Sequence, residues 1–174
     1  MPDFKNDAMF DIRAKLWNDL VYTGIFKEED YYSDNIGDVI VPIFPVQQVP
    51  ELNQFLSGKK HIVYDKISTK YDPNWWMCQD QIMFTLYSTD YSEIIEMQNL
   101  IIDLFRRYDA SADEVQNHGI QAHGESGDFK FFSTRIADIN PISPSLDLQG
   151  FFEGQVVIEV MYARETDPYS GRYM

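Results

Sequence analysis

The chain has 174 residues, of which 44% are hydrophobic and 15% aromatic, and its formal net charge is −14. This length and apolar content suffice for one domain with its own hydrophobic core. The charge argues against sequence-independent binding to nucleic acid, because such binding depends on Lys and Arg displacing counterions from phosphates.

The first element expected along the chain is a helix over residues 6–21. Met9, Ile12, Leu16 and Leu20 recur at spacings of three and four residues, so they share one helix face. We expect this helix to dock through that face onto the rest of the domain.

Residues 27–58 are expected to form a long extended arm. An acidic run without a basic residue opens the segment: Glu28, Glu29, Asp30, Asp34 and Asp38. The apolar stretch VIVPIFPVQQVP follows, and its prolines favour extended backbone or an edge strand over a helix. Its apolar side chains need a cover, which either the chain's own core or a neighbouring subunit provides. The candidate subunit or partner interface comprises Val39, Ile40, Val41, Ile43, Phe44 and Val46.

Two strands and a helix are expected next, over residues 61–68, about 76–88 and 90–107. In the second strand Ile82, Phe84 and Leu86 alternate with other residues, as in a half-buried strand. Asp90 is a candidate helix N-cap, and Glu93 three residues later would complete a capping box. We predict that the apolar stripe of this helix packs onto the sheet face of the three alternating residues; the stripe comprises Ile94, Met97, Ile101 and Leu104.

Two more strands, around residues 129–134 and 156–161, close the chain. The linker NPISPSLDLQG joins them and allows an antiparallel pair. The order of elements favours an α+β fold, with a mainly antiparallel four-stranded sheet flanked by two main helices and the extended arm. Residues 1–165 are expected to form this single domain, and residues 166–174 a C-terminal tail.

The chain offers no pattern typical of catalysis, so we expect no enzyme, no catalytic residue, no cofactor and no metal. His118, His123, Glu125 and Asp128 lack the spacing of a helical metal site and lie among glycines. Asp65 and Asp80 would form a carboxylate pair only if neighbouring strands brought them together. The single cysteine, Cys78, allows no intramolecular disulfide and is expected to be an inert, packed thiol. No apolar run approaches the roughly 20 residues that cross a bilayer, so we expect a soluble protein without a membrane partner.

The run LYSTDYSEIIEMQNLIIDLF, which starts at Leu86, together with the closing strand VIEVMYAR resembles the tail terminator proteins of tailed bacteriophages, also called tail completion or neck proteins. The likeness covers roughly residues 5–165, although the arm is longer than it implies. It implies a small antiparallel or mixed sheet flanked by helices. It also implies a virion structural protein, assembled in the host cytoplasm, whose copies form a ring, expected to be a hexamer, in the tail or neck. The implied partners are other copies of the chain, the tail-tube protein that the ring caps, the neck or connector protein, and DNA that passes through the lumen without sticking.

Two other interpretations stay open at this point. One is a different phage structural protein, such as a head–tail connector or a tail-tube component. The other is a small acidic enzyme or ligand-binding module. The mass of the protein in solution separates them first, because a ring requires association between copies and an enzyme does not.

Overall fold

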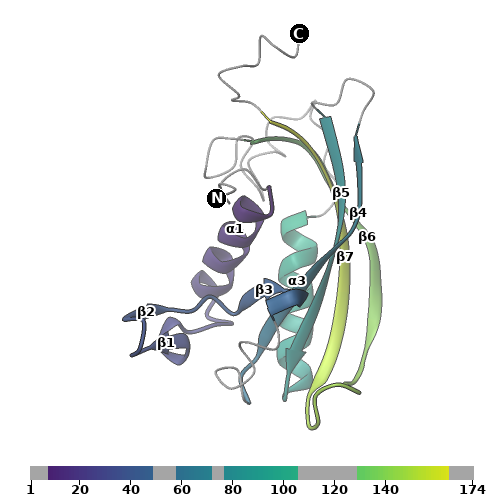
Figure 1. The fold of residues 1–174 in the computed structure, drawn as a ribbon. Coiled ribbons are helices and arrows are strands. Elements are labelled where there is room, and N and C mark those ends of the chain that lie inside the picture. Colours follow the sequence, from purple (N-terminus) through teal and green to yellow (C-terminus); the bar gives the residue numbers. More distant parts are fainter. Residues whose placement is uncertain (1–7, 49–57, 72–76, 106–128, 165–174) are drawn as a thin grey trace.

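The computed structural model describes residues 8–48, 58–71, 77–105 and 129–164. Two long helices and four long strands dominate these ranges (Figure 1). In chain order the elements are α1 (Ala8–Tyr22), the 3-10 helix η2 (Glu28–Tyr31), β1 (Tyr32–Ser33), β2 (Asp38–Val39), β3 (Ile43–Pro45), the 3-10 helix η3 (Val46–Gln48), β4 (His61–Tyr71), β5 (Met77–Ser88), α3 (Tyr91–Phe105), β6 (Phe129–Pro144) and β7 (Phe152–Arg164).

The main sheet has five strands in the order β3-β4-β5-β7-β6. The four long strands pair antiparallel, as predicted, and β3 pairs parallel with β4. The prediction of an α+β chain with two main helices is confirmed, but the prediction of four strands is wrong. The fifth strand, β3, comes from the segment predicted as an arm, and its Ile43 lies opposite Ile62.

The segment predicted as one long extended arm is not extended as a whole. Its described part contains η2, a hairpin made of β1 and β2, then β3 and η3. Asn, Asp and Gly dominate the turn between β1 and β2, and Gly37 adopts a φ of 72°, a conformation that favours glycine. Turn residues, more than the prolines, therefore shape the first half of this segment.

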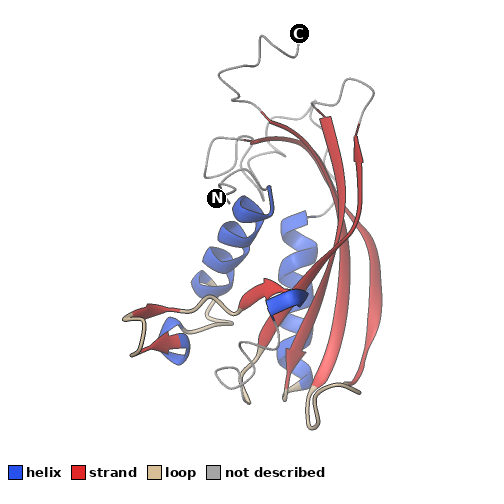
Figure 2. Ribbon diagram, in the orientation of Figure 1, coloured by secondary structure: helices blue, strands red, loops and turns tan. Residues whose placement is uncertain are grey.

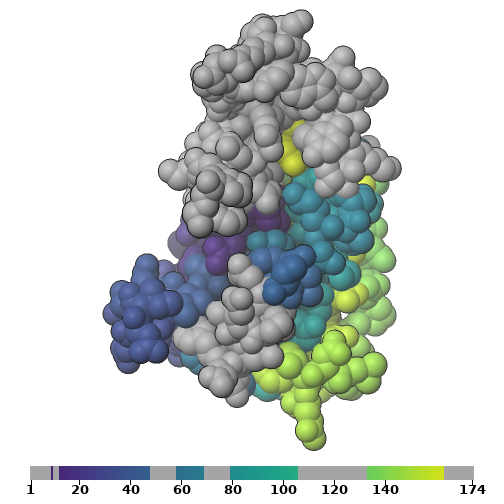
Figure 3. Space-filling view, viewed as in Figure 1, coloured from purple at the N-terminus to yellow at the C-terminus, as the bar shows by residue number. Residues whose placement is uncertain are grey.

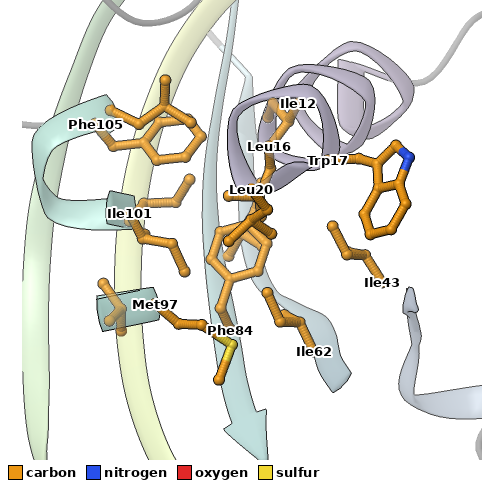
Figure 4. Packing of buried hydrophobic residues seen from close by; sticks show 14 of the residues in the cluster. Ile12, Leu16, Trp17, Leu20, Ile43, Ile62, Phe84, Met97, Ile101 and Phe105 are labelled. Carbon is orange, nitrogen blue, oxygen red and sulfur yellow. The ribbon is translucent and has the colours of Figure 1, made fainter. Parts of the chain in front are cut away.

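Both long helices cover the same face of the main sheet (Figures 1 and 2). The predicted face of α1 is buried, and so is the predicted stripe of α3, which packs against Ile82, Phe84 and Leu86 in one hydrophobic core. Ile43 and Ile62 close this core beneath α1 (Figure 4). The predicted packing of α3 on β5 is confirmed.

Gly154 on β7 lets α3 approach the sheet closely. A Cβ atom at this position would lie 2.8 Å from Ile94 and 2.9 Å from the side-chain amide of Gln98. Both distances are shorter than normal contacts, so a larger residue would push the helix away from β7.

The junction of β5 and α3 is stabilised by polar contacts, and it corrects one detail of the prediction. Asp90 caps α3, because its carboxylate accepts a hydrogen bond from the backbone N–H of Ser92 at 2.9 Å. Glu93 does not complete a capping box. Its carboxylate accepts instead from the Ser88 hydroxyl at 2.6 Å and from Lys60 at 3.2 Å. Glu93 therefore connects the start of α3 to the residue just before β4.

Candidate interaction surfaces

The six residues predicted as an interface do not share one surface. Ile43 and Phe44 are buried within the chain's own fold, whereas the side chain of Val46 is 43% exposed. The other three are half-buried: Val39, Ile40 and Val41. The two most apolar positions of the segment are thus covered by this chain itself, and a contact with a partner stays a prediction for the exposed part.

Strand β3 is held from both faces of the sheet. On the helix side, Ile43 joins the main core, and the Arg13 guanidinium of α1 donates hydrogen bonds to the carbonyls of Ile43 and Val41, the latter at 3.3 Å. Burial lowers the pKa of Arg13 from its ordinary value. Phe44 contacts a second group of rings.

This second group is an aromatic cluster around His61. The imidazole stacks on Phe44 at 5.8 Å and on Tyr87 at 5.0 Å between ring centroids, and Phe151 meets it edge-on. His61 Nδ1 lies 2.9 Å from the carbonyl oxygen of Lys59, so this nitrogen carries a proton and donates it. Burial lowers the pKa of His61, and burial with the nearby Glu153 raises the pKa of Tyr87 to about 12. Both rings are therefore uncharged at neutral pH.

A projecting segment, here called the acidic hairpin (residues 28–39), stands on a rigid aromatic base. The Tyr31 ring lies 6.2 Å from that of Trp17 and 5.5 Å from that of Phe26, and its hydroxyl donates to the carbonyl of Lys60 at 2.6 Å. Burial, reinforced by the nearby Asp30 and Glu93 carboxylates, raises the pKa of Tyr31. Tyr31 is thus a neutral side chain held by the aromatic rings and by its hydrogen bond, and the rest of the hairpin extends from it.

Beyond this base most residues of the acidic hairpin are exposed. It extends away from the helices and the sheet, at the left of Figures 1 and 3. Ile36 in its turn is 66% exposed, and Tyr32 at the start of β1 is 50% exposed. All five carboxylates of the predicted acidic run are exposed here, so the run is a solvated surface, but one that projects and carries the exposed Ile36 in its turn. The sequence Asp34–Gly37 signals the turn; the projection itself has no sequence signal.

A second exposed apolar surface, here called the α3–β6 strip, lies at the other edge of the sheet. Gln98 of α3 donates to the carbonyl of Asn140 on β6, so the flank of α3 that carries Tyr91 and Ile95 faces β6. Ile139 lies opposite Val156, whose side chain is buried in the helix-side core. The strip comprises Tyr91 (49% exposed), Ile95, Ile139 (45% exposed) and the half-buried Ile136, Ile142 and Phe152.

One buried polar cluster lies on the helix side of the sheet. The Asp80 carboxylate accepts a hydrogen bond from the Tyr162 hydroxyl at 2.7 Å and lies 3.3 Å from the Lys66 ammonium. Within the described part of the chain, its Oδ1 atom has no hydrogen-bond partner. Asp65 lies opposite Met83, on the other face, so the two aspartates do not form the carboxylate pair considered from the sequence. Asp80 of β5 thus links β4 through its ion pair with Lys66 and β7 through its hydrogen bond from Tyr162.

The described residues contain no group of three or more His, Cys, Asp or Glu side chains placed to hold a metal ion. The histidine cluster considered from the sequence, at residues 118–128, lies outside them, as does the tail at residues 166–174. No helix within the described ranges has the length and apolar character needed to cross a membrane.

Comparison with known proteins gives no match, neither to a family model nor to a curated protein. A function for this chain is therefore inferred from its own residues and their geometry.

Proposed function

We propose that this chain is a virion structural protein, a tail terminator. Its copies form a ring that caps the tail tube and joins it to the head–neck connector, and DNA passes through the lumen. The ring is expected to contain six copies, as the resemblance implies.

The residues that carry the resemblance support this proposal because they form one compact unit. β5 ends at Ser88, the turn follows, and α3 starts at Tyr91 with Asp90 as its cap. The mixed sheet with both helices on one face agrees with the architecture that the resemblance implies. This agreement is at the level of architecture and does not by itself assign a role.

The observation that carries the proposal is the exposure of apolar side chains on the acidic hairpin and on the α3–β6 strip of a chain that buries a hydrophobic core. Monomeric proteins seldom leave contiguous apolar patches uncovered, and such patches mark interfaces. Ile36 and Tyr32 on the acidic hairpin, and Tyr91 and Ile139 on the α3–β6 strip, are exposed although the interior contains many fully buried residues. A protein whose task is assembly needs such surfaces.

Capping of tail tubes tests the proposed function directly. Tubes assembled from the tail-tube protein of the same genome are incubated with the purified chain and viewed by negative-stain electron microscopy. We expect a ring-shaped density at one tube end and no further growth when more tube protein is added. An unrelated acidic protein of similar size and charge is the control for adsorption.

Three other results would contradict the terminator role. Incorporation along the whole tube would indicate a tube component. Binding to the connector with no binding to tube ends would indicate a connector protein. A monomer that binds neither would favour the enzyme or ligand-binding alternative.

A further inference from the structure

The aromatic cluster around His61 joins a short edge strand to the interior of the main sheet. On one side of the imidazole lies Phe44, which belongs to β3, the outermost strand. On the other side lies Tyr87, which belongs to β5, and Phe151 of the loop between β6 and β7 meets the ring edge-on. Only 5% of His61 is exposed. The imidazole is therefore enclosed between an edge strand and an inner strand.

The two strands that enclose this ring differ in how firmly they are paired. β5 pairs along nearly its whole length, with β4 on one side and β7 on the other. β3 has three residues and pairs with residues 62–64 of β4 alone. Ile43 and the hydrogen bonds from Arg13 hold β3 on the helix side of the sheet, and Phe44 holds it on the opposite side. The enclosure therefore opens with the least loss of strand pairing on the side of β3.

The charged and titratable side chains near the cluster do not neutralise a charge on the imidazole. They are Lys59, Lys60, Tyr87, Glu153 and Asp147; residues 43–48, which form β3 and η3, contribute none. Both lysines lie over aromatic rings at the base of the acidic hairpin, and the two carboxylates act on the hydroxyl of Tyr87. Among the described residues, the hydrogen-bond partner of His61 is a neutral backbone carbonyl.

Protonation of His61 would place a positive charge in this enclosure. Burial disfavours the charged form of an imidazole and lowers the pKa of His61. Attraction between a cation and the faces of the neighbouring rings offsets part of this effect. In a state in which the ring meets water, the imidazole binds its proton at the ordinary pKa of histidine. A fall in pH below that value therefore favours states in which the enclosure is open.

We infer that the His61 cluster is an acid-sensitive latch: protonation of His61 releases Phe44 and with it β3, while β4 stays paired with β5. Three residues separate β3 from the acidic hairpin, so the release also frees one end of the hairpin. Residues 62–64 of β4 then become a free sheet edge, which another strand can join. The latch concerns the isolated chain and does not depend on the terminator role.

Amide hydrogen exchange, followed by NMR, tests the latch at two neighbouring residues of β4. The N–H of Ile62 donates to the carbonyl of Pro42 at 2.8 Å, so its exchange measures release of the β3 segment. N–H groups alternate sides along a strand, so the N–H of Val63, which lies opposite Thr85, points to β5 and is the matched control. Division of each rate by the intrinsic rate at the same pH gives the opening equilibrium at that residue.

In the wild type, the opening equilibrium at Ile62 should rise by up to about tenfold for each pH unit below about 6.5, because the open form binds an additional proton. Val63 should remain at least about tenfold more protected at each pH, because its exchange requires β4 to separate from β5. His61→Phe keeps a ring between Phe44 and Tyr87 and removes the titration. In this variant the dependence of Ile62 exchange on pH should disappear.

Two exchange results would overturn the latch. Equal protection of Ile62 and Val63, with the same dependence on pH, would place the opening in the whole sheet. An opening at Ile62 that is independent of pH, or that depends on pH equally in His61→Phe, would exclude His61 as its cause.

Titration of the His61 ring resonances in the wild type gives a second measurement, which does not require the variant to fold. We expect a pKa below the ordinary value of histidine together with the pH-dependent opening at Ile62. A pKa at or above the ordinary value would show that the neighbouring rings favour the imidazolium, and the latch would then be wrong. Capping of tail tubes at neutral pH is independent of all these results, so the latch and the terminator role are tested separately.

Discussion

At the scale of single residues, His61 is a neutral base enclosed by aromatic rings. The groups that face it are Phe44, Tyr87 and Phe151, with the carbonyl of Lys59 as its hydrogen-bond acceptor and the Glu153 carboxylate close to Tyr87. Because its folded pKa is lowered by burial, the unfolded chain binds a proton at a higher pH than the folded chain. Stability from this residue is complete above the unfolded pKa of about 6.5 and is lost as pH falls below it.

We therefore expect His61→Phe to reduce the dependence of stability on pH between neutral and mildly acidic conditions. The free energy of unfolding, measured with urea, should fall with decreasing pH more steeply for the wild type, by up to about 1.4 kcal/mol per pH unit. Phenylalanine keeps the ring stack and removes the titration. Parallel curves for the two proteins would show that His61 is protonated equally in both states.

Tyr162 is the second residue for which we predict a change in stability, here from the loss of its hydroxyl group. Its hydroxyl donates to the buried Asp80 carboxylate, so Tyr162→Phe removes a hydrogen bond to a charged group while keeping the ring. We expect a loss of about 1.5–3 kcal/mol in the free energy of unfolding. Tyr22→Phe is the matched control, because Tyr22 is almost fully exposed, and it should change stability by no more than about 0.5 kcal/mol. Equal effects of the two changes would contradict the role of the hydrogen bond.

At the scale of elements, α3 is held by its buried stripe. Ile101 is fully buried in the core, so its truncation leaves a cavity there. Ile101→Ala should lower the free energy of unfolding by about 2–5 kcal/mol in chemical denaturation. Ile95→Ala, on the exposed flank of the same helix, should change it by only about 0.5 kcal/mol at concentrations where copies do not associate. A loss below about 0.5 kcal/mol for Ile101→Ala would refute the packing.

The composition of the segment around β3 suggested an interface with a partner, whereas the burial of Ile43 and Phe44 predicts a role in folding. Because Ile43 and Phe44 are buried on opposite faces of the sheet, Ile43→Asp and Phe44→Asp should leave the chain insoluble or unfolded. Val46→Asp, three residues from Ile43 and exposed, should remain folded with normal thermal unfolding. A folded, monomeric Ile43→Asp/Phe44→Asp double variant would instead place both residues in an interface between subunits.

The long elements were predictable because the apolar residues in each recur at a regular spacing. α1, α3 and β5 repeat apolar residues at the spacing of a helix or a strand over many residues, and local spacing decides them. β3 has three residues and the hairpin strands have two, so neither is long enough to show a period. β6 continues through Pro141 to Pro144, which the sequence placed in a linker, because an edge strand with irregular register tolerates proline.

The exposed surfaces were not predictable for a related reason. Tyr91 and Ile95 lie three positions and one position from the buried Ile94 of the same helix, and the position of β6 at the sheet edge leaves their flank open. Ile36 is exposed because the aromatic base at Tyr31 directs the hairpin away from the core. Exposure at both places depends on contacts between residues distant in the sequence.

At the scale of the whole molecule, most described basic side chains interact with other groups of the same chain. Lys15, Lys60, Lys66 and Arg135 pair with Asp19, Glu93, Asp80 and Glu159, and the Arg135 pair lowers the pKa of Glu159. The exposed carboxylates of the acidic hairpin then face solvent in a chain of net charge −14. Such a surface repels phosphates, as the proposed passage of DNA would require.

We accordingly expect the wild type not to bind duplex DNA at physiological ionic strength. Fluorescence anisotropy of a short labelled duplex, titrated with protein over a range of salt concentrations, measures this. The triple variant Glu28→Lys/Glu29→Lys/Asp30→Lys reverses three exposed charges of η2 without touching the core, so it should gain weak binding that disappears as salt rises. Binding by the wild type, with an affinity that falls steeply with salt, would instead show that the chain neutralises phosphates. That outcome would contradict the passage of DNA past a surface that does not retain it.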